Sequence, residues 1–190
     1  MTGFTSFEYS FAGKWLELLK EVQPSLARVA VLEHADNANR MGYLQAAERA
    51  ASELNVAVLA PEVRQESEFE GIFAGLAREP GIGLIVPPDP FTLSRRAAII
   101  ALTQRYRLPS VYAFPPFVTD GGLMSYGIDN KDMYRRSASY VDRVLRGERP
   151  GELPVQASNK FELIVNLNAA RGLGLTLPAA LLSRADEVIE

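Results

Sequence analysis

Short polar and aromatic side chains follow the apolar, strand-like runs of this sequence, and such residue types hold small ligands. The candidates are Asp36, Asn37, Asn39, Asp89, Phe91, Thr92, Phe114, Tyr126 and Asp129. In an open parallel sheet the carboxyl ends of the strands meet at one edge, where these folds bind ligands. The positions therefore predict a ligand-binding edge, with carboxylates and amides for polar groups and rings for stacking.

Seven of the nine candidates also have a structural alternative. Five of them fit ordinary helix caps or turns, because short polar side chains accept hydrogen bonds from nearby amides: Asp36, Asn37, Asn39, Asp89 and Thr92. Phe114 fits the packing of a loop, and Tyr126 fits a core position with its hydroxyl bonded locally. Their expected convergence on one edge favours a ligand site.

Catalytic alternatives are weaker. A Ser–His–Asp set would combine Ser94 or Ser125 with His34 and Asp129, but neither serine lies in a G-x-S-x-G elbow. The three candidate aspartates would form an Mg²⁺ or phosphotransfer pocket, yet no lysine follows a strand where a phosphoryl oxygen needs one. The first strand-to-helix turn, EHADNANR, has no glycine for a dinucleotide. The sequence thus predicts no catalytic residue, no metal and no cofactor.

Alternating strand and helix patterns must position these residues. Strands are predicted at 28–34, 56–63, 81–89, 108–114 and 123–129, and helices at 11–22, 41–54, 68–78, 91–107 and 131–146. Residues 115–122 are predicted to be a loop. Because the strand runs are apolar on both faces, they predict an α/β fold with a doubly wound, mainly parallel, flavodoxin-like sheet.

The C-terminal part has a different pattern, which suggests a division at residue 147. Residues 1–147 form the predicted α/β lobe, including the helix near 131–146. Residues 148–190 are predicted to be a linker, a strand at 160–166 and a helical tail that packs back on the lobe. In the second helix the periodicity places five residues toward the core: Met41, Leu44, Ala47, Ala51 and Leu54.

Composition excludes several classes of protein. The 190 residues carry a net charge of −3 and a pI near 5.4, which argues against a nucleic-acid partner. There is no cysteine, and hence no disulfide or thiolate site. No run is long and apolar enough for a membrane span, and the N-terminus lacks a signal-peptide pattern.

Several stretches resemble a known family. They are TGF, WLELLKEVQPSLARVAVL, GLIVPPDPFTLSRR, GGLMSYGIDNKDMYRRSASYVDRVLRGERPGELPVQ and FELIVNLNAARGLGLTLPAALLSRADEVIE. They resemble the second lobe of ABC-transporter substrate-binding proteins, which have type I periplasmic-binding folds and are related to carriers of aromatic amino acids or sugars. The resemblance covers nearly the whole chain.

The resemblance implies a non-catalytic lobe that closes on a small solute. Asn39 matches a family asparagine, although Arg40 replaces a customary serine. Asp89 matches an aspartate of an Asp-Asn pair, although Pro90 replaces the asparagine. The segment 126–129 matches the run into the crossing between lobes. These departures keep the site and leave the identity of the solute open.

Full-length relatives carry an export signal and a first lobe, so the resemblance predicts a remnant or a C-terminal part. By family resemblance its location is periplasmic, whereas the chain as written would be cytoplasmic. The apolar face of helix 131–146 (Tyr134, Val141, Val144 and Leu145) is predicted to be exposed and to support a homodimer.

The sequence therefore predicts a solute-binding component of an ABC import system, or a remnant of one. Its expected partners are a small polar or aromatic solute and, in full-length relatives, an ABC permease. Two alternatives stay open at this point: a ligand-sensing regulatory domain, and a flavodoxin-like or hydrolytic enzyme that uses the acidic edge.

Overall fold

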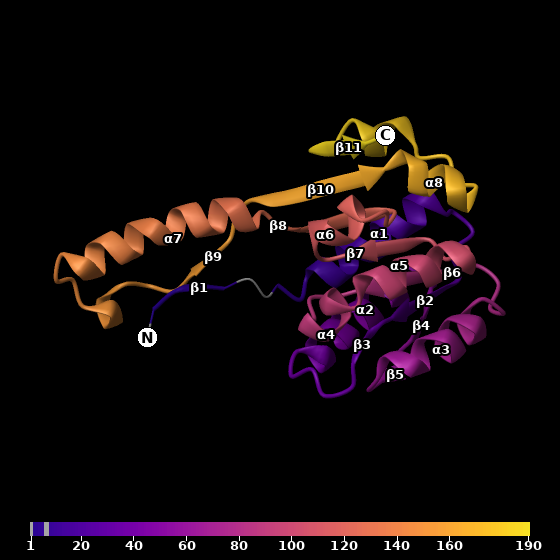
Figure 1. The fold of residues 1–190 in the computed structure, drawn as a ribbon, viewed down its shortest axis with the longest axis horizontal. Coiled ribbons are helices and arrows are strands. Elements are labelled where there is room, and N and C mark those ends of the chain that lie inside the picture. The colour runs from indigo at the N-terminus through magenta and orange to yellow at the C-terminus, as the bar shows by residue number, and fades with distance from the viewer. Residues whose placement is uncertain (1, 6–7) are drawn as a thin grey trace.

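A seven-stranded sheet with helices on both faces forms the body of the protein. The computed structural model describes residues 2–5 and 8–190. Across this sheet the strand order is β11-β10-β8-β7-β6-β2-β4 (Figure 1). The α/β doubly wound fold expected from the sequence is confirmed.

Five strands of the sheet are parallel to one another. They are β4 (Ala57–Leu59), β2 (Arg28–Val31), β6 (Ile82–Val86), β7 (Ser110–Tyr112) and β8 (Met124–Ile128). Every residue of β6 and β7 is buried, as expected for central strands covered on both faces. Their carboxyl ends therefore lie at the same edge of the sheet.

Two further strands come from the C-terminal part of the chain. The strand β10 (Phe161–Asn166) pairs antiparallel with β8, with Leu163 opposite Tyr126. The strand β11 (Glu187–Ile189) pairs parallel with β10, and α8 (Leu167–Leu173) and α9 (Ala179–Leu182) connect them. The predicted division at residue 147 stays a prediction.

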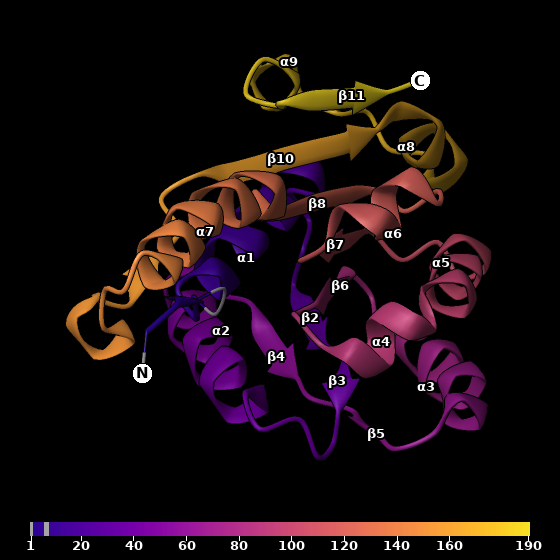
Figure 2. The same cartoon turned by 60° about the vertical axis from the view of Figure 1, so that its left-hand side comes forward.

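Helices cover both faces of the sheet (Figure 2). On one face lie α1 (Phe11–Val22) and α2 (Arg40–Leu54), whose apolar residues share a core with Trp15 at its centre. On the other lie α3 (Phe69–Leu76), preceded by the short 3₁₀ helix η1 (Glu66–Glu68), and α5 (Arg96–Arg105). This two-faced packing holds the carboxyl edge of the strands in place.

Four predicted segments differ from the structure. Predicted strands 28–34 and 56–63 each divide, and their second parts, β3 (Glu33–His34) and β5 (Glu62–Val63), pair with each other. The predicted helix 91–107 divides into α4 (Pro90–Ser94) and α5. The predicted loop 115–122 contains α6 (Pro115–Thr119). Its two prolines are tolerated because they lie in the first turn, where backbone amides have no hydrogen-bond partner within the helix.

The inward face of α2 was only partly predicted. Ala47 and Ala51 are buried, as expected, but Met41 is 54% exposed. Tyr43 takes the core position instead and is fully buried. A turn of 3.6 residues places Met41 and Tyr43 on opposite sides of the helix, so only one of them faces the core.

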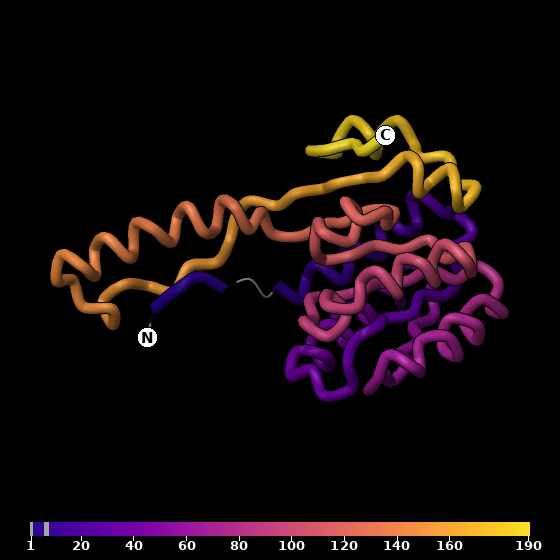
Figure 3. Tube along the Cα trace, in the orientation of Figure 1, coloured from indigo at the N-terminus to yellow at the C-terminus, as the bar shows by residue number. Residues whose placement is uncertain are grey.

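An arm projects from the body at the carboxyl edge (Figures 1 and 3). It consists of α7 (Asn130–Leu145), the 3₁₀ helix η2 (Pro150–Glu152), and the pair β1 (Phe4–Thr5) and β9 (Gln156–Ala157). The Tyr140 hydroxyl donates to the Pro154 carbonyl at 2.8 Å, which ties α7 to the returning chain.

The apolar face of α7 is exposed, as the sequence predicts. Tyr134 is 72% exposed and Leu145 is 80% exposed, with Val141 and Val144 also accessible. Within the described part of the chain, no helix has the length and hydropathy needed to cross a membrane.

Candidate functional site

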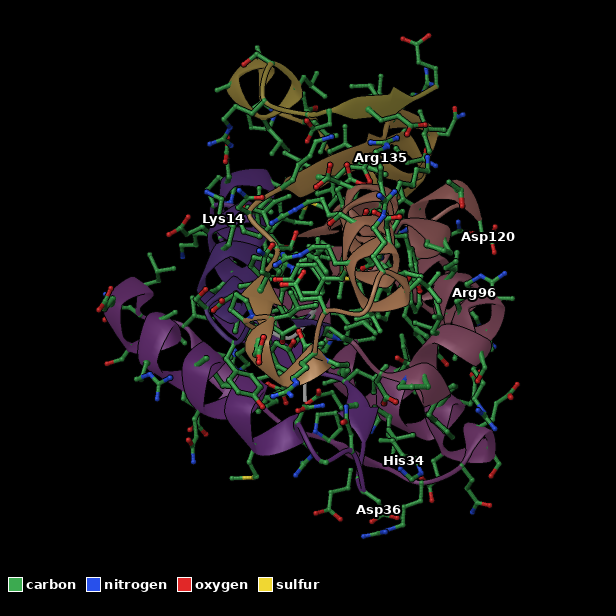
Figure 4. The ribbon with its side chains drawn as sticks, turned by 90° about the vertical axis from the view of Figure 1, so that its left-hand side faces the viewer. Lys14, His34, Asp36, Arg96, Asp120 and Arg135 are labelled. Atoms are coloured by element: carbon green, nitrogen blue, oxygen red, sulfur yellow. The ribbon has the colours of Figure 1, made fainter. Side chains whose placement is uncertain are left out.

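Two hollows lie at the carboxyl edge of the parallel strands. We call the first the acidic hollow; it has a volume of about 290 Å³ and is lined by His34, Asp36, Asn37, Asp89, Pro90 and Phe91. We call the second the narrow hollow; it has about 20 Å³ and is lined by Phe11, Pro88, Ala113, Phe114, Gly127, Ile128 and Asn130. Figure 4 faces the arm and shows His34 and Asp36 together at one end of the molecule. The edge predicted from the sequence is therefore hollowed.

Asp89 holds two segments of the acidic hollow together, β3 and the start of α4. Its side chain is 3% exposed, and its two oxygens accept hydrogen bonds from the amides of His34 at 2.7 Å and Phe91 at 2.9 Å. The second bond caps α4, so the structural alternative for Asp89 is confirmed. Thr92 is also structural here, because its buried hydroxyl donates to the Asp89 carbonyl at 3.0 Å.

An aromatic stack forms one wall of the acidic hollow. The Phe91 ring lies 4.6 Å from the His34 ring and 3.9 Å from the Arg95 guanidinium. The His34 ring nitrogens face backbone groups, the Arg64 carbonyl at 3.1 Å and the amide of Asp36 at 3.2 Å. These contacts hold His34 as part of the wall.

The Ser–His–Asp alternative finds no support in the described residues. The Ser94 hydroxyl donates to the Phe91 carbonyl at 2.9 Å. Ser125 is buried within β8, on a different strand from His34, and its hydroxyl has no partner among residues 2–5 and 8–190. Asp129 pairs with Lys160 at 2.9 Å. Each group is thus engaged or buried apart from His34.

The three residues after β3 are placed differently from one another. Asp36 is exposed and pairs with Arg64 at 2.9 Å. The Asn37 amide nitrogen lies 3.4 Å from both a Glu33 carboxylate oxygen and the Pro88 carbonyl. Asn39 accepts a hydrogen bond from the Tyr9 hydroxyl at 3.0 Å and its side chain does not cap α2. Only Asp36 and Asn37 line the acidic hollow.

The remaining candidates spread along the edge. Phe114 lines the narrow hollow. Asp129 accepts a hydrogen bond from the Asp132 amide at 2.9 Å and caps α7, and its bond with Lys160 lowers the pKa of the Asp129 carboxyl. Tyr126 packs against Phe11 with ring centroids 5.4 Å apart, on the α1 face, and is not among the residues that line either hollow. The ligand-binding role of all nine residues stays a prediction.

Sequence reasoning missed Glu33, the first residue of β3, which lies behind Asn37. Its side chain is 1% exposed. Burial, reinforced by the nearby Asp89, raises the pKa of the Glu33 carboxyl from 4.5 to about 8. An acidic residue at the end of the run VAVLEH was the available indication, since charged groups are rarely buried without a reason.

Gly127 was also missed, and it sets the width of the narrow hollow. A Cβ atom at this position would lie 2.3 Å from the Ala113 carbonyl oxygen, so β7 and β8 approach closely only because the residue is glycine. We expect Gly127→Ala to destabilise the fold by about 1 to 3 kcal/mol, measured by urea unfolding. Gly71→Ala is the control, because its Cβ would meet no atom within 4 Å. Equal stability of both variants would contradict this account.

The described residues contain no group of three or more His, Asp or Glu side chains placed to hold a metal ion. The edge offers instead hydrogen-bonding groups and aromatic rings beside a buried acid. This chemistry suits the binding of a small organic molecule.

Comparisons with known proteins identify the family of the chain. The family model for ABC transporter substrate binding protein matches residues 1–189. A tyrosine-binding protein of Clostridioides difficile is 22% identical over 168 residues, which are 88% of this chain and 48% of that protein. The chain thus spans about half the length of this curated relative.

Solved structures show the same fold. A conserved domain protein from Vibrio cholerae superposes with a TM-score of 0.87 at 24% identity, over 98% of this chain and 62% of that one. An ABC domain in complex with L-Trp from Streptococcus pneumoniae superposes with a TM-score of 0.84 at 22% identity, over 99% and 64%. Together with the family match, these results show that the chain belongs to the ABC transporter substrate-binding protein family.

Proposed function

We propose that this chain binds an amino-acid-type solute, with an aromatic or other apolar side chain, at the carboxyl edge of its sheet. The observation that carries the proposal is the presence of two hollows at that edge, one acidic and one partly aromatic. The chain acts by holding the solute and performs no reaction on it.

The chemistry of the edge supports this class of solute. The narrow hollow has a volume of only about 20 Å³, so an aromatic ring would pack over its opening, against the half-buried Phe114. The acidic hollow offers carboxylate and amide groups for the polar end of the solute. Relatives that bind tyrosine and L-Trp make these amino acids the first ligands to test.

The proposal includes the wider role of the family. We infer that the bound solute is delivered to an ABC permease, in the periplasm or outside the cell membrane. The homodimer expected through the exposed face of α7 stays a prediction, which light scattering measures directly.

Replacing Phe114 with alanine tests the proposal. We expect the variant to bind L-tyrosine and L-tryptophan about three- to tenfold more weakly in calorimetric titrations, because a stacking surface is lost. Tyr106→Ala is the matched control: it removes another half-buried ring, which follows α5 at the opposite edge of the sheet. Equal weakening by both substitutions, or no binding by the unaltered chain, would contradict the proposed site.

A further inference from the structure

A buried carboxylate with an unpartnered oxygen lies behind the ligand-binding edge. Glu33 is 1% exposed. Its Oε2 atom has no hydrogen-bond partner among residues 2–5 and 8–190. Buried polar groups in native proteins are nearly always bonded, so this oxygen indicates a place where a ligand supplies the missing contact.

The charges around Glu33 favour an added cation. Asp89 faces it from the segment after β6, and Arg40 and Tyr43 face it from α2. Burial and the charge of Asp89 raise the pKa of the Glu33 carboxyl, and together they outweigh Arg40, which lowers it. The Arg40 guanidinium donates to the Ala60 carbonyl at 3.3 Å. The carboxyl is therefore mainly protonated at neutral pH, and a cation beside it would make its ionised form favourable.

Asn37 marks the position that such a cation would take. Its amide nitrogen lies 3.4 Å from Glu33 Oε1 and 3.4 Å from the Pro88 carbonyl, which are long distances for hydrogen bonds. Asn37 lines the acidic hollow and Pro88 lines the narrow one. Glu33 itself lines neither hollow, so a stronger donor would reach its carboxylate from the acidic hollow by replacing the Asn37 amide, where it would meet Oε1 beside the unpartnered Oε2.

We propose that Glu33 determines specificity for the ammonium group of an amino-acid solute, which it binds together with the Pro88 carbonyl in place of the Asn37 amide. The inference rests on the proposed function. On binding, Glu33 releases its proton to solvent and the solute keeps its three ammonium protons. The resulting carboxylate–ammonium pair is a charge-assisted hydrogen bond in a dry environment.

The test compares L-tryptophan with indolepropionate, which lacks only the ammonium group, by isothermal titration calorimetry. We expect the unaltered chain to prefer L-tryptophan by about tenfold or more, and Glu33→Gln to abolish this preference. Glu62→Gln is the matched control, because Glu62 lies directly opposite Glu33 in the β3–β5 pair but is exposed. This control variant should keep the preference.

Proton release provides a second readout that needs no substitution. Titrations of L-tryptophan in phosphate and in Tris at neutral pH should show that the unaltered chain releases close to one proton per ligand. Binding of both compounds with equal affinity and no proton release would overturn the role of Glu33 and leave the proposed function standing. Binding of neither compound would overturn both.

Discussion

Replacement of Trp15 with alanine is expected to lower the free energy of unfolding by about 3 to 5 kcal/mol. Trp15 is fully buried at the centre of α1, with its ring 5.6 Å from that of Tyr43 and 6.0 Å from that of Phe11. Its indole nitrogen donates to the Tyr126 carbonyl at 2.7 Å, which fixes α1 against β8. The substitution therefore leaves both a cavity and an unpaired carbonyl.

Urea unfolding of the purified variants measures this effect. Tyr134→Ala is the control, because the Tyr134 ring is large but 72% exposed on α7, and its loss should change stability by less than about 0.5 kcal/mol. A loss below about 1 kcal/mol for Trp15→Ala would show that the helix α1 is not packed on the sheet as described.

Stability is expected to fall as the pH rises from about 4.5 to about 8, because of Glu33. The pKa of this carboxyl is raised from 4.5 to about 8 in the folded protein. Between these values the folded state binds a proton that the unfolded state has lost. The contribution of the protonated Glu33 carboxyl to stability is therefore complete below pH 4.5 and lost above pH 8. The limiting slope is about 1.4 kcal/mol per pH unit.

Urea unfolding across this range, with Glu33→Gln as the comparison, measures the effect. The variant carries a permanently neutral side chain and should show a much flatter profile. Asp129 has the opposite effect on the pH dependence of stability. Lys160 lowers the pKa of the Asp129 carboxyl, so the contribution of this ion pair to stability is lost only as the pH falls below the usual carboxyl range. Identical profiles for the two proteins would contradict the described environment of Glu33.

Local patterns in the sequence were sufficient for much of the fold. The helix α1 has the predicted bounds, because an apolar stripe at helical spacing is stopped shortly before Pro24. The division of strand 28–34 was not predictable from the local pattern. It depends on the pairing of β3 with β5, and the two segments lie about 30 residues apart in the chain.

The candidate site was predictable only in its location. The residues after β3 and β6 meet because parallel strands end at one edge, which is a topological rule. Tyr126 was expected at that edge, but alternation along β8 places it on the α1 face with Met124 and Ile128. Glu33 was missed because its burial depends on packing against α2 and Asp89, which no local pattern records.

We expect the carboxyl edge of the sheet to bind an amino-acid-type solute. Titration of the isotopically labelled chain with L-tryptophan, followed by amide chemical shifts, tests it most directly. We expect saturable shifts concentrated at residues 33–39, 88–91 and 113–114. Little change is expected at residues 104, 121, 166, 168, 169 and 172, which line a hollow at the opposite edge. Shifts centred on that opposite hollow, or none at millimolar ligand, would contradict it.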